Sequence, residues 1–387
     1  MSVTSVGIKD QVVIQKDHFQ GLLDALIKTG YDVIGPALQN KAVVYDHLTS
    51  IKELPIGWTD EHGPGKYRLV RRQDEAYFGY VLGPISWKKY LFPSQVTLWE
   101  ARKNGPEYQL NKIDNNISKT AFLGVRPCEI HAIAKQDKIL MQGEYLDPIY
   151  KARREKIFIV AVNCAEPGEN CFCTSMQTGP RAETGFDIAL TEVIDQDHHY
   201  FVAEIGSEAG AEIIGHIKFE MADPGAKTAA EQVSRKASEN MGKKLDTRGI
   251  KELLYANSEH PRWDDVASRC LTCANCTMVC PTCFCVNIDD TTNLTGTSAE
   301  RRRRWDSCFT LDHSYIHGGS IRVSAKSRYR QWLTHKLASW IDQFGDSGCV
   351  GCGRCITWCP AGIDITDEVR AIREGGRTAP ASAAVKE

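Results

Sequence analysis

The sequence predicts an α+β protein, in which an N-terminal α/β domain with a mixed sheet precedes a mainly α-helical domain. Residues 120–162 alternate between apolar strand candidates and a helical segment, which is typical of α/β structure. Residues 270–359 instead carry two four-cysteine motifs, separated by a long stretch. At 387 residues the chain also exceeds the size at which one core usually stops growing, so we expect two domains.

The N-terminal part begins with a helix that is followed by short strands. Apolar residues recur at helical spacing in residues 16–28, and Gly30 ends this helix. Strand candidates at 31–34 and 42–45 are rich in β-branched residues. Residues 54–83 contain several Gly and Pro turns, so we expect irregular or antiparallel structure there.

The clearest α/β pattern is a strand, a turn, a helix and a second strand. Residues 121–125 are the first strand candidate, 130–140 the helix and 156–162 the second strand. Two more strands, at 187–194 and 200–205, are joined by a polar turn. In sheets of this kind, ligands collect beyond the strand ends, so the loops that follow the strands are candidate sites.

Four cysteines lie in those loops. Cys128 follows the first strand, Cys164 follows the second, and Cys171 and Cys173 share a loop with Cys164. Because loops at strand ends can meet at one edge of a sheet, we expect these thiols to come together.

The composition changes between residues 222 and 251, which are rich in Ala, Lys, Glu and Ser and poor in large apolar groups. This composition predicts an exposed helix or a linker. We therefore assign residues 1–256 to the α/β domain and residues 257–375 to the α-helical domain. The remaining residues, 376–387, are expected to form a disordered tail.

The second domain is organised around two copies of the motif Cys-x2-Cys-x2-Cys-x3-Cys-Pro. The first runs from Cys270 to Pro281 and the second from Cys349 to Pro360. This spacing is a bacterial-type iron-sulfur signature, in which three thiolates hold one cluster and the fourth binds the other cluster of the pair. A Cys-x2-Cys pair alone could indicate zinc. Two complete copies, each closed by proline, favour iron.

The motifs predict eight ligands for two 4Fe-4S clusters in a dicluster ferredoxin-like domain. The ligands of the first cluster are Cys270, Cys273, Cys276 and Cys359. The ligands of the second cluster are Cys349, Cys352, Cys355 and Cys280. Residues 281–348 form a far longer connection than the one in small ferredoxins. Helical periodicity at 327–344 predicts that this connection is largely helical, with little strand.

The four N-terminal thiols are predicted to form a third metal site. We favour a third iron-sulfur cluster bound by Cys128, Cys164, Cys171 and Cys173. A four-cysteine zinc site and buried, unliganded thiols are the alternatives. The tight Cys171-x-Cys173 spacing is unusual for zinc and favours iron.

Three cysteines and an arginine run lie outside the groups of predicted ligands. Cys283 and Cys285 are expected to pack against the first cluster, with an extra ligand role as the alternative, and Cys308 has no assigned role. The run from Arg301 to Arg304 predicts a solvated face, because nucleic-acid binding would need more basic neighbours and interleaved aromatic residues.

Composition argues against several other classes of protein. A formal net charge of −2 favours neither nucleic acid nor an anionic membrane as a partner, and no apolar stretch is long enough to span a membrane. Residues 1–15 do not have the pattern of a secretory signal. The fifteen cysteines therefore predict a cytoplasmic, reducing location, in which thiols bind metal instead of forming disulfides.

Several short segments resemble a known family, the beta subunits of cytoplasmic sulfhydrogenases, which are nickel-iron hydrogenases that use NADP or NAD. The segments that carry the resemblance are Gly124–Cys128, Asn163–Cys164, Cys171–Met176, Cys280–Cys285 and Trp305–Cys308. An iron-sulfur subunit of anaerobic sulfite reductase is similar across the same features. The diagnostic part of the resemblance runs from about Thr120 to the second motif.

This resemblance implies an electron-relay subunit with no substrate site of its own. Its implied partners are the small and large subunits of a nickel-iron hydrogenase, together with a flavin/NAD(P)-binding subunit. The sequence agrees, because it has no Gly-x-Gly-x-x-Gly after a strand for a dinucleotide. Two alternatives remain. One is the electron-input subunit of an anaerobic sulfite reductase. The other is a flavin-binding oxidoreductase subunit, since the N-terminal part distantly resembles subunits that act on deazaflavin coenzymes.

Overall fold

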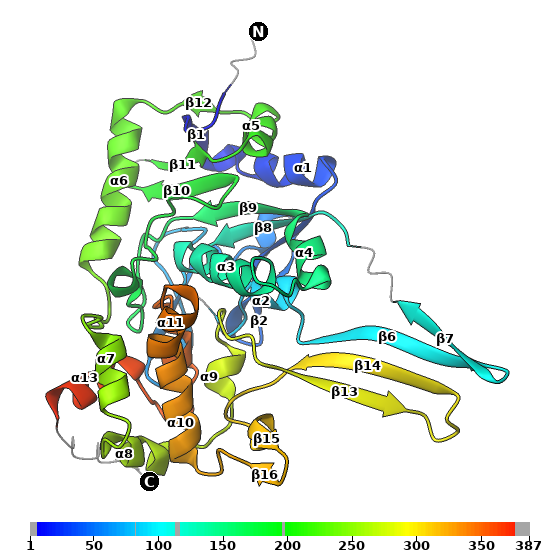
Figure 1. Cartoon of the computed structure of the whole chain (residues 1–387). Coiled ribbons are helices and arrows are strands. Elements are labelled where there is room, and N and C mark those ends of the chain that lie inside the picture. Colours follow the sequence, from blue (N-terminus) through cyan, green and yellow to red (C-terminus); the bar gives the residue numbers. More distant parts are fainter. Residues whose placement is uncertain (1–5, 82, 113–116, 196–197, 376–387) are drawn as a thin grey trace.

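A computed structural model describes residues 6–81, 83–112, 117–195 and 198–375, so the expected tail at 376–387 lies outside the described residues. A mixed eight-stranded sheet forms the centre of the N-terminal part (Figure 1), in the order β12-β1-β11-β10-β9-β8-β2-β3. Its strands are β1 (Gln11–Gln15), β2 (Asp32–Gln39), β3 (Ala42–His47), β8 (Thr120–Val125), β9 (Ile157–Val162), β10 (Ile188–Ile194), β11 (His199–Ile205) and β12 (Glu220–Met221). Strands β2, β8, β9 and β10 pair in parallel and the outer pairs are antiparallel, which confirms the predicted mixed sheet.

Helices pack on both faces of this sheet. One face packs against α1 (Gln20–Lys28) and α5 (Glu208–Gly215). The other face packs against α2 (Lys88–Leu91), α3 (Pro127–Leu140) and α4 (Pro148–Arg154). Side chains alternate between the two faces of a strand, so Leu123 of β8 joins the first core and its neighbour Phe122 joins the second. Burial of both faces explains why β8 and β9 are almost continuously apolar.

The segment whose composition predicted an exposed helix or a linker forms a helix, α6 (Pro224–Glu239). It packs against β10 and β11 (Figure 1). Its small residues Ala226 and Ala230 contact Val193 and Val202 of these strands, so the face of α6 towards the sheet needs no large apolar side chain.

The C-terminal part is built from helices around a second core. The helices are α7 (Ile250–Ala256), α8 (Arg262–Arg269), α9 (Asn275–Met278), α10 (Ala325–Thr334), α11 (Trp340–Phe344), α12 (Arg354–Thr357) and α13 (Ile365–Glu374). The helix predicted for residues 327–344 is present, but a π-helical turn at His335–Ser339 interrupts it. Ile250 and Leu254 of α7 also belong to this core. The domain division at 256/257 stays a prediction.

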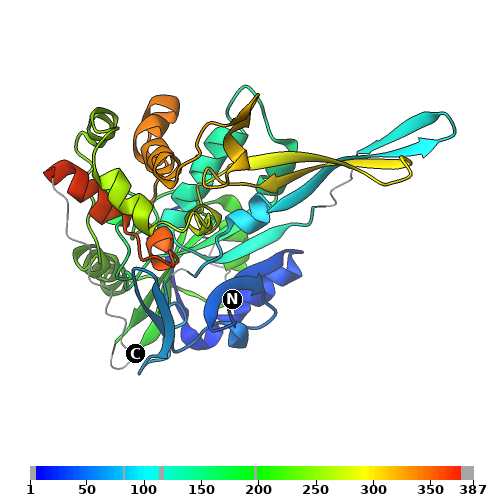
Figure 2. The same ribbon diagram turned by 90° about the horizontal axis from the view of Figure 1, so that it is seen from below.

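A four-stranded antiparallel arm projects from the body of the molecule (Figures 1 and 2). Its strands, in the order β13-β14-β6-β7, are β6 (Gln95–Asn104), β7 (Glu107–Lys112), β13 (Val286–Thr292) and β14 (Ser298–Trp305). The expectation of little strand between the two cysteine motifs was therefore wrong. Strand β14 pairs with β6, which lies far away in the sequence, and this long-range pairing leaves no local signal in the chain.

The arginine run lies on β14 and is only partly solvated. Arg301 pairs with Asp290 on the neighbouring strand, at 2.6 Å from Nη2 to Oδ2. Arg303 instead points inward, is 8% exposed and forms an ion pair with Asp147. Arg303 thus contacts groups inside the protein, and the prediction of a solvated face was wrong at this residue.

The remaining elements are short. Strands β4 (Trp58–Gly63) and β5 (Lys66–Arg71) form an antiparallel hairpin, as expected for residues 54–83, and β15 (Tyr315–Ile316) pairs with β16 (Gly319–Ser320). The 3-10 turns are η1 (Lys16–His18), η2 (Ile51–Glu53), η3 (Cys173–Met176) and η4 (Asp312–Ser314). Across the described ranges, no helix is both long enough and apolar enough to cross a membrane.

Candidate metal centres

All fifteen cysteines lie within the described residues, and each is a free thiol. The first of three groups lines one cavity. Five cysteines are in its wall, namely Cys355 and the four predicted ligands of the first cluster, Cys270, Cys273, Cys276 and Cys359. Apolar side chains, among them Phe309 and Trp332, form much of the remaining wall. A 4Fe-4S cluster requires four thiolate ligands, so the four predicted ligands around this apolar cavity fit such a cluster.

The second group lies next to the first and combines cysteines of both motifs. Burial raises the pKa of Cys355 well above its ordinary value, and the neighbouring Cys349, Cys352 and Cys280 raise it further. Cys280, the last cysteine of the first motif, thus lies among the first three cysteines of the second. Cys355 also lines the cavity of the first group, so the two groups are adjacent.

The loops of the two motifs share one backbone conformation. In the first loop, Thr272 and Ala274 have positive φ values of 49° and 65°. The equivalent residues of the second loop are Gly351 and Gly353, with φ values of 65° and 74°. Left-handed backbone is uncommon for residues other than glycine, and at functional sites it costs about 1–3 kcal/mol per residue. The first loop therefore keeps this left-handed turn although Thr272 and Ala274 carry side chains that make it costly.

This turn directs backbone amides at cysteine sulfur. Thr272 N donates to Cys270 Sγ at 3.4 Å, and Gly351 N donates to Cys349 Sγ at 3.4 Å. Such hydrogen bonds stabilise the anionic form of the sulfur, which is the form that binds metal. The two loops are thus equivalent in hydrogen bonding as well as in spacing.

The third group lies at the carboxyl ends of β8 and β9, where the four N-terminal thiols were expected to meet. Cys128 and Cys173 are buried and pack with Val350 and Cys352. Burial raises the pKa of Cys173, and Cys164 and Cys171 raise it further, so all four predicted thiols lie near one another. Pro127 occupies the first turn of α3, where a missing N–H costs nothing, and this places Cys128 at the start of the helix.

A single zinc ion, the alternative occupant of the third group, would need several ligand side chains arranged around one point. In the part of the chain that is described, no three His, Cys, Asp or Glu side chains are arranged to hold one metal ion. A cubane does not require that arrangement, because each thiolate binds a different iron.

The third group is in direct contact with the second motif. Phe172 N donates to Gly351 O at 2.8 Å, and Cys171 Sγ lies 3.9 Å from Cys352 O. There is little space between them, since a Cβ on Gly351 would lie 2.6 Å from the carbonyl carbon of Phe172. The second group is thus adjacent to the first group and in contact with the third. The three groups therefore form a series with the second group in the middle.

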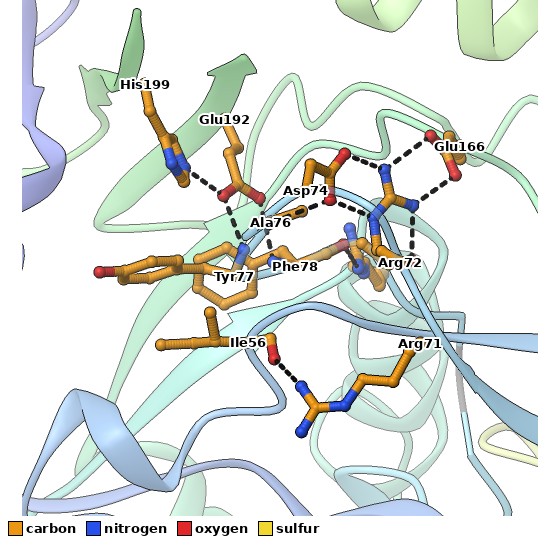
Figure 3. Close-up of polar contacts among 12 residues, drawn as sticks. Ile56, Arg71, Arg72, Asp74, Ala76, Tyr77, Phe78, Glu166, Glu192 and His199 are labelled. Carbon is orange, nitrogen blue, oxygen red and sulfur yellow. Dashed lines mark hydrogen bonds and ion pairs between the residues drawn. The ribbon is translucent and has the colours of Figure 1, made fainter.

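Polar contacts hold the loop of the third group against the body of the protein (Figure 3). Glu166, between Cys164 and Cys171, binds Arg72 at 2.8 Å, and Arg72 also binds Asp74 at 2.6 Å. These ion pairs tie the loop to the chain that follows β5.

Glu192 of β10 anchors the next part of that chain (Figure 3). Its carboxylate is buried and accepts hydrogen bonds from Tyr77 N at 2.7 Å and Phe78 N at 2.9 Å. Its third partner is His199 Nε2, at 2.8 Å. Arg126, whose side chain bonds to Cys164, donates from Nη2 to the carbonyl of Phe78 at 2.7 Å. Glu192 of β10 and Arg126, which directly follows β8, thus fix the chain segment beside the third group.

Sequence reasoning missed a buried lysine beside the second group. Lys336 Nζ lies 3.3 Å from Cys280 Sγ and 3.6 Å from Cys283 Sγ. Burial by itself lowers the pKa of Lys336, but four cysteines, Cys280, Cys283, Cys349 and Cys355, together outweigh burial and raise the pKa well above its ordinary value. A sequence signal existed, because Trp332, Lys336 and Trp340 are spaced by four, which places a lysine on the apolar side of the helix.

Cys280 is the exception among the buried motif cysteines. Its pKa lies well below the ordinary value, because Cys283 donates a hydrogen bond to its sulfur, and Lys336 and Thr282 add to this effect against burial. The protein thus favours the thiolate of Cys280, which is the form that binds metal.

The last two cysteines lie together with a histidine. The pKa of Cys285 is lowered to about 4, mainly by a hydrogen bond from Cys308 and also by His313, against the opposing effect of burial. His313 Nδ1 lies 3.1 Å from Asp306 Oδ2, so this histidine is hydrogen-bonded. Neither cysteine lines the cavity of the first group.

Comparisons with known proteins agree with this geometry. Residues 269–363 match the family described as 4Fe-4S dicluster domain. Over 367 residues, the chain is 29% identical to sulfhydrogenase 2 subunit beta of Pyrococcus furiosus, with 94% of this chain and 98% of the relative covered. An alignment of that length extends well before Thr120, so the similarity is broader than the sequence motifs indicated. The chain thus carries a 4Fe-4S dicluster domain and is similar, along nearly its whole length, to the beta subunit of a sulfhydrogenase.

Proposed function

We propose that this chain is an iron-sulfur electron-transfer subunit, which relays single electrons between a nickel-iron hydrogenase module and a flavin/NAD(P)-binding subunit. The observation that carries the proposal is the series of three cysteine groups. Cys355 is shared between the surroundings of the first and second groups, and Cys171 contacts the Cys352 backbone between the second and third. A series of adjacent centres is what a relay needs.

The proposed ligands follow the three groups. The first cluster is held by Cys270, Cys273, Cys276 and Cys359. The second is held by Cys280, Cys349, Cys352 and Cys355. A third iron-sulfur cluster is held by Cys128, Cys164, Cys171 and Cys173. Clusters of this kind supply reversible one-electron transfer.

The residues of the chain hold these centres at fixed positions and exclude water. Phe309 and Trp332 line the first cavity, and Cys280 and Cys349 of the second group are each 8% exposed. The series has one end at the surface, because Cys273 is exposed. We propose that one partner docks near Cys273 and that the other reaches the third group.

The proposed partners rest on the similarity to a sulfhydrogenase subunit, whose alignment covers both parts of this chain. A complex with hydrogenase subunits would require no substrate site in this chain itself. The proposal includes a cytoplasmic location, where fifteen thiols would stay reduced and able to bind iron.

Iron and acid-labile sulfide in the anaerobically purified chain test the metal content. Three 4Fe-4S clusters correspond to about twelve irons and about twelve sulfides per chain. The double variant Cys128→Ser, Cys164→Ser should lose about four irons and one paramagnetic signal of the reduced protein. An unchanged signal count in that variant would exclude the third cluster. Zinc as the main metal would overturn the proposal as a whole.

Co-purification from the native host tests the partners. Nickel and flavin in the complex, with no flavin absorption band in the isolated chain, are expected. A sirohaem protein in place of a nickel protein would assign the chain to a sulfite reductase. Flavin bound to the isolated chain would instead indicate a flavin-binding oxidoreductase subunit.

A further inference from the structure

The ammonium group of Lys336 is enclosed beside the second cysteine group. The residue is 5% exposed, and its Nζ lies 3.3 Å from Cys280 Sγ, 3.6 Å from Cys283 Sγ, 3.3 Å from Thr282 Oγ1 and 3.3 Å from Gly348 O. Its three N–H donors thus face two sulfurs, a hydroxyl and a carbonyl.

None of these four partners of the Lys336 ammonium group is a carboxylate. Within the described ranges, no Asp or Glu oxygen lies within ion-pair distance of Lys336 Nζ, although Lys135, another buried lysine, pairs with Asp346. Burial of an unpaired charge is costly, so buried charges in proteins are paired. The anion available to Lys336 is the sulfur of Cys280.

The backbone around Lys336 holds it in this position. Lys336 lies in the π-helical turn that interrupts the predicted helix, and such turns are frequent at functional sites. Its carbonyl accepts a hydrogen bond from Gly348 N at 2.8 Å, and Gly348 directly precedes Cys349 of the second motif. Lys336 is therefore fixed to the second motif by its backbone and its side chain.

The first group has no equivalent. Among the hydrogen bonds of the described residues, none joins a lysine to Cys270, Cys273, Cys276 or Cys359. A second buried lysine, Lys88, is also on the side of Cys280, because its Nζ donates to Cys283 O at 3.0 Å and lies over the Trp305 ring. Among the described residues, the second group thus has two buried lysines beside it, whereas no lysine is hydrogen-bonded to a cysteine of the first group.

We propose that Lys336 raises the reduction potential of the second cluster relative to the first. This inference rests on the proposed function, in which Cys280 is a cluster ligand. Reduction adds one electron and hence one negative charge to the cluster and its thiolates, and no covalent bond forms or breaks. A fixed ammonium near Cys280 Sγ stabilises the more negative state, and the low local polarity strengthens this attraction. Electrons would therefore reside preferentially at the second cluster rather than at the first.

Redox titration of the purified chain tests the inference. The variants Lys336→Met and Lys336→Gln remove the charge, and Gln keeps a hydrogen-bond donor. With a mediated chemical reductant and paramagnetic resonance detection, one midpoint potential should fall in both variants and the others should stay in place. We expect at least a tenfold change in the ratio of oxidised to reduced cluster at a fixed potential, which corresponds to about 59 mV for one electron.

Three matched variants separate charge from packing. Lys326→Met removes a lysine of α10 that pairs with Asp264 on the surface, and it should leave all potentials unchanged. Thr282→Val removes a neutral group 3.2 Å from the same sulfur and should cause a smaller shift than Lys336→Gln. Lys336→Arg keeps the positive charge, so the midpoint potential of the second cluster should stay close to its wild-type value.

Iron content distinguishes the possible failures. Unchanged potentials in Lys336→Gln at full iron content would overturn the inference and leave the proposed function standing. An equal fall in Lys336→Arg would also overturn it, because the effect would then not follow charge. A wild-type chain without iron-sulfur signals would overturn the proposed function itself.

Discussion

Glu129 and Arg354 form a buried ion pair, with Glu129 Oε1 2.6 Å from Arg354 Nη2. Their side chains are 1% and 0% exposed. Glu129 directly follows Cys128 of the third group, and Arg354 lies between Cys352 and Cys355 of the second. One charge pair thus joins the neighbours of two candidate centres that belong to distant parts of the chain.

Breaking this pair should strongly destabilise the protein. In the variant Glu129→Gln, Arg354 would keep a buried charge without its partner, which typically costs about 3–5 kcal/mol of the free energy of unfolding. Tyr45 Oη and Trp87 Nε1, which bond to the same carboxylate at 2.7 and 3.1 Å, would also be perturbed. The loss is measured as a fall in the denaturant midpoint under anaerobic conditions.

An exposed ion pair provides the control for this variant. On α13, Arg370 Nη2 lies 2.7 Å from Asp367 Oδ1, and the two side chains are 63% and 43% exposed. Asp367→Asn should cost less than about 1 kcal/mol. Equal effects of Glu129→Gln and Asp367→Asn would contradict the structural role of the buried pair.

Serine variants test whether the fourth cysteine of each motif binds the cluster of the other motif. Cys359→Ser should alter the same paramagnetic signal as Cys276→Ser, whereas Cys280→Ser should alter the signal that Cys352→Ser alters. The reason is that each group combines three cysteines of one motif with the fourth of the other. If Cys280→Ser changed the signal of Cys276→Ser, each motif would hold its own cluster. Cys308→Ser should retain the full iron content.

Gly351 should not tolerate a side chain. Its φ of 65° disfavours other residues, and a Cβ would lie 2.6 Å from the carbonyl carbon of Phe172. Gly351→Ala should therefore displace the loop of the third group, lower the iron content and cost at least about 1–3 kcal/mol through backbone strain alone. Iron assay and thermal unfolding measure the two effects.

The equivalent residue of the first loop is the control. Thr272 already has a side chain at φ 49°, so Thr272→Ala should retain iron and stability. Full iron content in Gly351→Ala would show that the contact with Phe172 is not needed by the third group.

Cys285 should react with alkylating agents in an unusual pH range. Its pKa is lowered to about 4, first by the hydrogen bond from Cys308, so the reactive thiolate is present above that pH. Its alkylation rate should stay nearly constant from about pH 6 to about pH 8, whereas an ordinary thiol with a pKa of about 8.5 becomes more reactive as pH rises. Mass spectrometry after timed alkylation gives the rate.

Removal of the hydrogen bond should restore ordinary behaviour. In Cys308→Ala the pKa of Cys285 should rise, and its alkylation rate should then increase with pH. A rate at Cys285 that already increases steeply with pH in the wild-type chain would contradict the lowered pKa.

Local sequence patterns indicated the candidate ligands and six of the eight strands of the central sheet, but not β1 and β12. Two-residue gaps between cysteines fit a tight loop, so the backbone turn at Thr272 and at Gly351 could be expected from spacing alone. The strands before Cys128 and Cys164 were recognisable because both faces of the sheet are buried, and their thiols meet because parallel strands end at one edge.

Only the tertiary structure decided how the parts connect. The pairing of β14 with β6, the Glu129–Arg354 ion pair and the contact of Lys336 with Cys280 each join residues that are distant in sequence. Such contacts depend on long-range packing, which local spacing and periodicity do not encode. The sequence by itself thus determined which cysteines are candidate ligands. Their order, and the charges that surround them, came from the packing of the whole chain.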